Sequence, residues 1–266
     1  MNIIVCVKEI PDPETPASAF NIDPVAKRAI PAKDNPPVMN PFDENAVEGA
    51  LRLKDSLGAH VSVLCMGATS AEKVLKHGLA MGADDAFLLN DSAFEDSDST
   101  STAYALAQAI KKIGEFDLIL CGRQAGDFDA GQVGLGIAEI LGIPSVTPIQ
   151  KIELTDGKAK VQRVITDGYE LVEVSLPALM TVSNELGEPR YATLKGIMAA
   201  GKKTVTVWSA QELGADASKI GAAGARTKML KLFIPVREAK CEFIEGENEA
   251  EAAVKLALRL REAKLI

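Results

Sequence analysis

The residues best suited to chemistry form a glycine-rich stretch at residues 118–142, LILCGRQAGDFDAGQVGLGIAEILG. After the strand-like run it bears Gly122, Gly126, Gly131, Gly134 and Gly136. Glycine lets a backbone approach a ligand closely, and the unpaired N–H groups at the start of a helix favour an anion such as phosphate. The stretch therefore predicts a nucleotide site at about residues 130–133, with a plain glycine-rich strand–helix turn as the alternative.

Two acidic residues in this loop, Asp127 and Asp129, restrict how a nucleotide is held. They would repel a phosphate that they faced, so we expect them to cap the helix or to accept hydrogen bonds from ribose hydroxyls and loop N–H groups. The loop has neither the G-x-G-x-x-G pattern of nicotinamide-binding folds nor the Walker pattern.

The remaining reactive residue types suggest no catalytic centre and no metal site. The cysteines are Cys6, Cys65, Cys121 and Cys241, with no C-x-x-C pair, and the histidines are His60 and His77. This spacing excludes zinc and iron–sulfur sites, and no Ser-His-Asp or Cys-His arrangement has support. Trp208 and Tyr191 are candidates for stacking on a flavin, with ordinary packing as the alternative.

Net charge, hydropathy and cysteine content limit which partners and which cellular compartment the sequence suits. The net charge of −8 over 266 residues argues against nucleic-acid binding, which needs a basic face. No apolar run reaches the length of about 18–20 residues that a membrane span requires. The chain starts directly with a strand-like run, and its cysteines suit a reducing compartment, so we expect a cytoplasmic protein without membrane insertion.

The first 145 residues alternate between strand and helix patterns. The expected strands are 2–7, 60–65, 86–89, 117–121 and 144–147, and the expected helices are 41–57, 69–81, 99–113 and 131–141. Asn40 is expected to cap the first helix, and residues 69–72 form a capping-box pattern for the second. This alternation predicts a mostly parallel, Rossmann-like sheet with helices on both faces. The loops at 7–11 and 65–68 would then flank the glycine loop at one edge.

After residue 149 the pattern changes. Asp-Gly pairs at 156–157 and 167–168 lie between alternating runs, which predicts an appended antiparallel hairpin section. Residues 184–224 are expected to be mostly irregular, with an isolated strand near 204–208, and residues 247–264 to form a terminal helix. We therefore expect an α/β domain at 1–200 and a C-terminal arm and helix at 201–266. The arm would rest on another chain, or alternatively pack back on its own domain.

The segment at 184–203, NELGEPRYATLKGIMAAGKK, is the second informative stretch. It carries Tyr191, Leu194, Ile197 and Met198 among Pro, Gly and Lys residues. Apolar side chains on a polar loop suggest a knob that docks into a partner. A loop folded onto the sheet is the alternative. Because Pro189 and Gly196 flank Leu194, we expect it to lie outside regular structure.

Together these segments resemble the electron-transfer flavoprotein β-subunit family over essentially the whole chain. The resemblance rests on IIVCVKEIPD, MNPFDENAVEGALRLK, ALAMGADDAFLL, CGRQAGDFDAGQVG and VQRVITDGYELVEVSLPALMTV, followed by EPRYATLKGIMAAGKK. It implies a heterodimer with an α subunit that carries most of the redox FAD site. It also implies a non-enzymatic carrier that takes electrons from flavoprotein dehydrogenases, such as the acyl-CoA dehydrogenases of fatty acid oxidation, and passes them onward. A universal-stress-type nucleotide-binding sensor is the alternative from another class.

The resemblance also implies site residues. The nucleotide contacts would be Cys6, Asn40, Pro41, Phe42, Asp43, Met66, Gly122, Arg123, Gln124, Ala125, Gly126, Asp127, Phe128, Asp129, Ala130, Gly131, Gln132 and Val133. The dehydrogenase-docking residues would be Arg190, Tyr191, Ala192, Thr193, Leu194, Lys195, Gly196, Ile197, Met198 and Ala199, with Leu194 as the apolar anchor.

The bound nucleotide is AMP in the simple carriers of this family and a second FAD, which accepts hydride from NADH, in its bifurcating members. The bifurcating type resembles G-R-Q-A-x-D-G-D-T-A-Q-V-G. This chain shares most of that pattern but has Phe128 and Ala130 in place of Gly and Thr. A bulky Phe128 could fill space that a flavin or nicotinamide ring needs, so both nucleotides stay open, with FAD slightly favoured.

Overall fold

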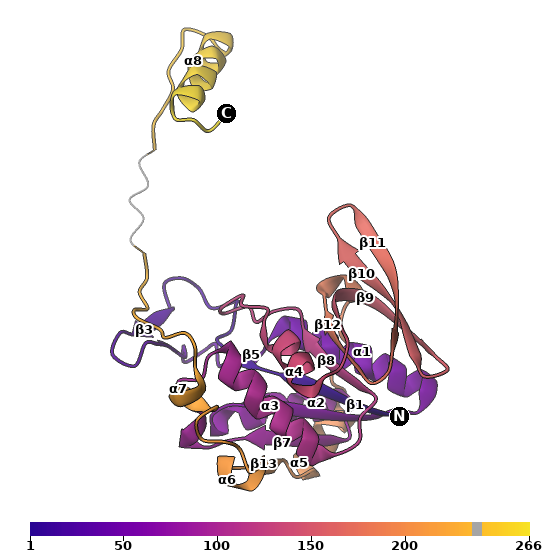
Figure 1. Cartoon of the computed structure of the whole chain (residues 1–266). Helices are drawn as coiled ribbons and strands as arrows, with labels where there is room; N and C mark the ends of the chain where they lie inside the picture. Colours follow the sequence, from indigo (N-terminus) through magenta and orange to yellow (C-terminus); the bar gives the residue numbers. More distant parts are fainter. Residues whose placement is uncertain (236–240) are drawn as a thin grey trace. The chain divides into compact units, whose positions relative to one another are not determined.

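The computed structural model describes residues 1–235 and 241–266 and divides the chain into two compact units, Met1–Leu232 and Phe233–Ile266. Each is described by itself (Figure 1). The boundary that the sequence predicts, between residues 200 and 201, falls inside a helix of the first unit. In the part of the chain that is described, no helix is long and apolar enough to cross a membrane.

The described part of the first unit is built on a nine-stranded sheet with the order β11-β10-β9-β12-β8-β1-β6-β7-β13. The strands are β1 (Asn2–Val7), β6 (His60–Met66), β7 (Asp85–Leu89), β8 (Leu118–Gly122), β9 (Ser145–Thr155), β10 (Lys158–Ile165), β11 (Gly168–Ser175), β12 (Ala178–Val182) and β13 (Thr206–Trp208). The central strands pair in parallel. Their near-continuous apolar sequences suit burial on both faces. The predicted α/β, Rossmann-like fold is confirmed.

The appended antiparallel section is also confirmed. Strand β9 pairs in parallel with β12 but antiparallel with β10, which pairs antiparallel with β11; this hairpin extends from the body of the unit in Figure 1. Asp156 and Gly157 both have positive φ, as the type I′ turn requires. At the second turn Ile165 pairs with Gly168, so the turn lies one residue earlier than the Asp-Gly pair predicts.

Helices cover both faces of the sheet. They are α1 (Pro41–Leu57), α2 (Glu72–Met81), α3 (Ser99–Ile113), α4 (Val133–Leu141), α5 (Leu194–Lys202), α6 (Ala210–Leu213) and α7 (Gly221–Gly224). Alternate residues of β1 point to opposite faces. Ile3 and Val5 join a core with α1 and α2, whereas Ile4 and Cys6 join a core with α3 and α4.

Short elements decorate this frame. The polar segment after β1 contains two small antiparallel pairs, β2 (Glu9–Ile10) with β5 (Val38–Met39) and β3 (Asn21–Asp23) with β4 (Arg28–Ile30). Single 3-10 turns occur at η1 (Thr69–Ala71), η2 (Ser92–Phe94) and η3 (Asn184–Leu186).

Three expectations about local structure are wrong. Residues 184–224 are not mostly irregular, because just over half of them lie in η3, α5, β13, α6 and α7. Strand β13 is not isolated, since it pairs in parallel with β7 and satisfies an otherwise open sheet edge. The capping-box pattern at 69–72 does not cap α2, because residues 69–71 form η1 and α2 begins only at Glu72.

The second unit contains helix α8 (Glu249–Glu262), close to the predicted range. Asn248 caps it by accepting a hydrogen bond from the Glu251 backbone N–H at 3.0 Å. Arg259 pairs with Glu242 at 2.9 Å and ties the helix to the segment before it. Val254 and Leu258 are exposed, so this helix presents apolar side chains.

Candidate functional site

The predicted nucleotide residues gather at the carboxyl edge of the parallel strands. Strands β8, β1 and β6 are neighbours in the sheet, and Cys6 of β1 lies beside Leu64 and Cys121. The loops that follow these strands therefore start at one edge, where ligands bind in open α/β sheets. Met66, at the end of β6, marks the far side of this group.

Asp43 ties two strand ends to the first turn of α1. Its side chain is buried, and Oδ2 accepts a hydrogen bond from the Lys8 backbone N–H at 2.8 Å while Oδ1 accepts one from the Gly122 N–H at 3.0 Å. A Cβ at residue 122 would lie 2.7 Å from the Phe42 carbonyl carbon, so this close approach requires glycine. Burial outweighs these hydrogen bonds and raises the pKa of Asp43 to about 7.

Asn40 occupies the N-cap position of α1 as predicted, but its side chain bonds the glycine loop and not the helix N–H groups. Its side chain is 1% exposed. The amide Nδ2 donates to the Gln124 carbonyl at 2.9 Å, and Oδ1 accepts from the Gly126 N–H at 3.0 Å. Pro41 does occupy the first turn of the helix, as expected. Asn40 and Asp43 thus direct their polar atoms at backbone groups of the loop and the strand ends.

The two loop carboxylates are paired within the protein. Asp127 receives the Lys8 ammonium at 2.6 Å, and Asp129 accepts a hydrogen bond from Gln124 Nε2 at 2.8 Å. Lys8 also lies 5.1 Å from the centre of the Phe128 ring. Lys8 offsets the charge of Asp127, and the Gln124 hydrogen bond engages one oxygen of Asp129, so these carboxylates are used within the protein.

The start of α4 has the features of an anion site. Within the described residues, no side chain caps this helix at Gln132, which leaves its first N–H groups available. Gly131 precedes it with a φ of +60°, which suits glycine. A phosphate group fits this donor set better than a cation or an uncharged ring.

Two further glycines of the stretch, Gly134 and Gly136, serve packing. A Cβ at Gly134 would lie 3.2 Å from Thr181 and 3.4 Å from the Cys121 sulfur. A Cβ at Gly136 would lie 2.8 Å from that of Ala103, where α4 meets α3. Gly134 and Gly136 therefore let α4 approach its neighbours, and only part of the glycine pattern faces the candidate site.

The cysteines and histidines have structural surroundings. Cys6, Cys65 and Cys121 are buried thiols, and burial raises the pKa of Cys65 to about 12. His60 pairs with Asp85 at 2.7 Å and His77 with Glu44 at 2.8 Å. Residues 1–235 and 241–266 contain no cluster of three acidic, histidine or cysteine side chains that could hold a metal.

Trp208 packs within the protein. Its ring lies 4.9 Å from the ring of Phe87 on the neighbouring strand β7, and the Lys112 ammonium lies over it. This geometry agrees with the packing alternative for Trp208. Tyr191, by contrast, is exposed.

The predicted docking segment is helical, which corrects the expectation for Leu194. Thr193 caps α5 by accepting a hydrogen bond from the Gly196 N–H at 3.0 Å, so Leu194 begins a regular helix. Leu194 is 75% exposed, and Ile197 and Met198 are exposed beside it. Gly196 lies against the Ala80 carbonyl of α2, and this contact seats the helix on the body of the unit.

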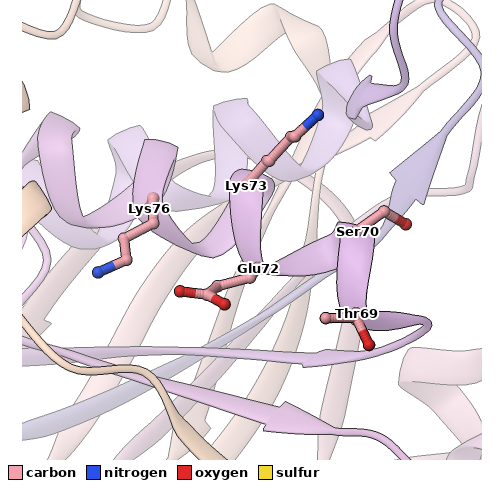
Figure 2. Close-up of a pocket in the computed structure, with 5 residues that line it drawn as sticks. All are labelled: Thr69, Ser70, Glu72, Lys73 and Lys76. Atoms are coloured by element: carbon pink, nitrogen blue, oxygen red, sulfur yellow. The ribbon is translucent and has the colours of Figure 1, made fainter.

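A shallow pocket at the start of α2 was not predicted from the sequence. It is lined by Thr69, Ser70, Glu72, Lys73 and Lys76 (Figure 2). Ser70 donates to Glu9 at 2.7 Å and Lys76 to the Ala200 carbonyl at 3.2 Å. Two of the polar groups here are therefore already used within the protein. A hydroxyl pair followed by two lysines one turn apart is the signal that sequence inspection could have used.

Comparison with known proteins decides the family. Residues 30–213 match the Electron transfer flavoprotein domain family. The chain is also 43% identical over its whole length to the electron transfer flavoprotein subunit beta of Thermoanaerobacterium thermosaccharolyticum, again over that protein's whole length. The chain belongs to the electron-transfer flavoprotein β-subunit family.

Other relatives of this electron-transfer flavoprotein chain come from different electron-transfer systems. It is 40% identical over all of both chains to the caffeyl-CoA reductase-Etf complex subunit CarD of Acetobacterium woodii. It is 38% identical, over 94% of each chain, to the acryloyl-CoA reductase electron transfer subunit gamma of Anaerotignum propionicum. A universal-stress-type sensor does not account for matches that span the whole chain.

Proposed function

We propose that this chain is the β subunit of a heterodimer with an electron-transfer flavoprotein α subunit. The heterodimer accepts electrons from flavoprotein dehydrogenases such as acyl-CoA dehydrogenases, or from NADH, and passes them to a downstream acceptor. The observation that carries this proposal is the full-length similarity to β subunits together with similarity to subunits named for acyl-CoA-type reductase systems. The chain acts as a carrier subunit and not as an enzyme in its own right.

The adenine nucleotide of this subunit binds at the carboxyl edge, along the glycine loop. The N–H groups at the start of α4 receive a phosphate, while Asn40 and Asp43 hold the loop in shape through its backbone. A bound flavin supplies the redox chemistry, and the protein supplies position and electrostatics. The redox FAD of the complex lies mainly on the α subunit.

FAD is the nucleotide that we favour for this site. The segments at 122–125 and 132–134 resemble the bifurcating type, and Phe128 is the main departure from it. Phe128 is 59% exposed, and its ring lies beside Lys8. Its exposure shows that it does not fill the loop interior, and the preference for FAD rests on the two matching segments.

The exposed face of α5 is the docking surface for a dehydrogenase. Leu194, Ile197 and Met198, with Tyr191 just before the helix, form an exposed apolar group. Such groups on a soluble protein commonly mark interaction sites, and a single apolar anchor can dominate binding. The C-terminal arm and helix would contact the α subunit. A cytoplasmic location is supported by the buried free thiols Cys6, Cys65 and Cys121.

Co-purification tests this proposal. An affinity-tagged form of the chain, produced together with an electron-transfer flavoprotein α subunit, should elute as a yellow heterodimer with a flavin absorption spectrum. The preparation should be reduced by a dehydrogenase and its substrate or by NADH. A stable, colourless homodimer that does not bind the α subunit would contradict the carrier function.

A further inference from the structure

We infer that one face of α1 positions the docking helix α5 so that it can bind the dehydrogenase. This face consists of Asn45, Glu48, Arg52 and Asp55. We call these four residues the α1 ladder. Their spacing places them on one face of a helix. The inference rests on the proposed docking function of α5 and adds residues that no resemblance assigned to it.

Glu48 is the centre of the α1 ladder. Its side chain is 6% exposed, and Oε2 accepts from the Arg190 backbone N–H at 3.2 Å and from Arg190 Nε at 2.7 Å. Oε1 accepts from Arg52 Nε at 2.8 Å and from Arg190 Nη2 at 3.3 Å. Burial acts to raise the pKa of Glu48, but the hydrogen bonds from Arg190 and Arg52 outweigh it and lower the pKa. The carboxylate is therefore charged and fully engaged.

The rest of the α1 ladder holds the backbone that leads into α5. Asn45 Nδ2 donates to the Gly187 carbonyl at 2.9 Å, and Arg52 Nη1 donates to the Leu186 carbonyl at 2.8 Å. Asp55 accepts from Arg190 Nη2 at 2.8 Å. Residues 186–190 are thus fixed shortly before Thr193 caps the helix.

This network of hydrogen bonds and ion pairs is suited to fixing the position of residues 186–190. A buried ion pair usually contributes little net stability, because desolvation opposes the attraction of the charges. Its hydrogen bonds are directional, however, so they select one placement of the chain. Along its length α5 is held by α2, through the Gly196 contact and through Lys76. The α1 ladder holds residues 186–190, which lead into the amino-terminal end of α5 and Leu194.

Arg190 changes role under this inference. The resemblance implies that it contacts the dehydrogenase, yet its guanidinium is committed to Glu48 and Asp55 within the chain. These contacts raise the pKa of Arg190 further above its ordinary value, with Glu48 as the main cause. Arg190 is a positioning residue: it holds the segment that leads into α5 and so sets where Leu194 lies.

The test compares Glu48→Gln and Leu194→Ala in the complete αβ heterodimer. The probe is a purified acyl-CoA dehydrogenase, reduced with its acyl-CoA substrate, that the wild-type heterodimer reoxidises. Glu48→Gln removes the charge but keeps the size of the side chain. We expect the KM for the heterodimer to rise about tenfold with kcat and nucleotide content unchanged, and amide hydrogen exchange to increase at residues 186–193.

Two further variants keep the result interpretable. Asp55→Asn lies at the exposed end of the α1 ladder and should fold normally, with a KM increase of about twofold. Asp84→Asn removes the ion pair with Lys54, which involves no residue of the α1 ladder, and should leave KM unchanged. A purely structural role predicts lower melting temperatures with unchanged KM for Glu48→Gln and Asp55→Asn. If Leu194→Ala raises KM and these two variants do not, the inference is wrong while the docking proposal stands. If Leu194→Ala also leaves KM unchanged, both are wrong.

Discussion

At the scale of single residues, the candidate site depends on side chains that bind backbone. Asn40 and Asp43 lie in or next to the first turn of α1, where their side chains could contact a nucleotide directly. They contact Gln124, Gly126 and Gly122 of the loop instead. A side chain that bonds two backbone groups at once holds the loop in one conformation. Their substitution should therefore alter loop shape before it alters ligand contacts.

The titration of Asp43 gives the first prediction. Its pKa in the folded protein is about 7, against about 3.9 in an unfolded chain. Between these values the folded state holds a proton that the unfolded state has lost. The contribution of Asp43 to the free energy of unfolding therefore falls as pH rises from about 4 to about 7, and is constant above that.

Urea unfolding of the wild type and of Asp43→Asn checks this prediction. Because the variant has no titrating group at residue 43, the wild type should lose about 3 kcal/mol relative to it between pH 5 and pH 8. All other groups titrate in both proteins and cancel in the difference. Parallel dependences of the two proteins on pH would show that Asp43 is ionised over the whole range.

Gly131→Glu gives the second prediction. Gly131 has a φ of +60° at the start of α4, so the variant adds backbone strain, a side chain and a negative charge at the anion site. We expect the purified heterodimer to lose its β-subunit nucleotide almost completely. Gly134→Glu is a less direct test, because Gly134 packs against Thr181 and Cys121.

The matched control is Gly157→Glu. Gly157 has a φ of +74° in the hairpin turn, with open space where a side chain would go. It carries the same backbone strain and the same added charge outside the nucleotide loop, so nucleotide content should be unaffected. Nucleotide at the wild-type ratio after Gly131→Glu would place the site elsewhere.

At the scale of elements, α1 and α5 connect the two proposed sites. The first turn of α1 holds the glycine loop, and its middle holds the segment before α5. Helix α5 in turn rests on α2. A rigid helix presents apolar side chains with less loss of conformational entropy on binding than a mobile loop does.

Leu194→Ala is the prediction that belongs to α5. Because Leu194 is 75% exposed, the variant should fold and keep its nucleotide and its α subunit. Loss of an apolar anchor of about 2 kcal/mol corresponds to a roughly thirtyfold weaker affinity for the dehydrogenase. Kinetics with a reduced dehydrogenase and thermal unfolding should both be measured on this variant.

Leu75→Ala supplies the opposite pattern as a control. Leu75 is fully buried in α2, so its truncation should cost about 2–5 kcal/mol of stability and affect transfer only through unfolding. If Leu194→Ala behaves like Leu75→Ala, with lower stability and normal transfer, then Leu194 is a core residue and not a docking residue.

At the scale of the whole molecule, nucleotide content separates the two types of carrier. We expect the denatured heterodimer to release two FAD, and the intact protein to be reduced by NADH, because the glycine loop resembles the bifurcating type. Chromatography of the released nucleotides measures this directly. Release of one FAD and one AMP, without reduction by NADH, would identify a simple carrier.

The two-unit organisation gives the last prediction. Every strand of the main sheet lies within Met1–Leu232, so a chain that ends at Leu232 should keep the circular dichroism and cooperative unfolding of the first unit. It should lose affinity for the α subunit, because we assign that contact to the C-terminal arm and helix. Pull-down with the α subunit checks this, and undiminished binding by the shortened chain would contradict the assignment.

Much of the fold could be predicted because its signals are local. The apolar runs at 2–7 and 118–121 predict buried parallel strands, and the Asp-Gly pair at 156–157 predicts a hairpin turn. Both depend on neighbouring residues and on backbone preferences. The same is true of the glycine-rich turn from strand to helix, which made the glycine loop a candidate site from the sequence alone.

The tertiary structure decided what these signals leave open. It placed regular elements within residues 184–224, because β7 offers a sheet edge to β13 and α2 offers a surface to α5. It also brought Arg190 into contact with Glu48, although the two residues are 142 positions apart in sequence. Sequence patterns report local conformation and burial, whereas the partner of a buried charge is chosen by whichever segment the fold brings within hydrogen-bond distance.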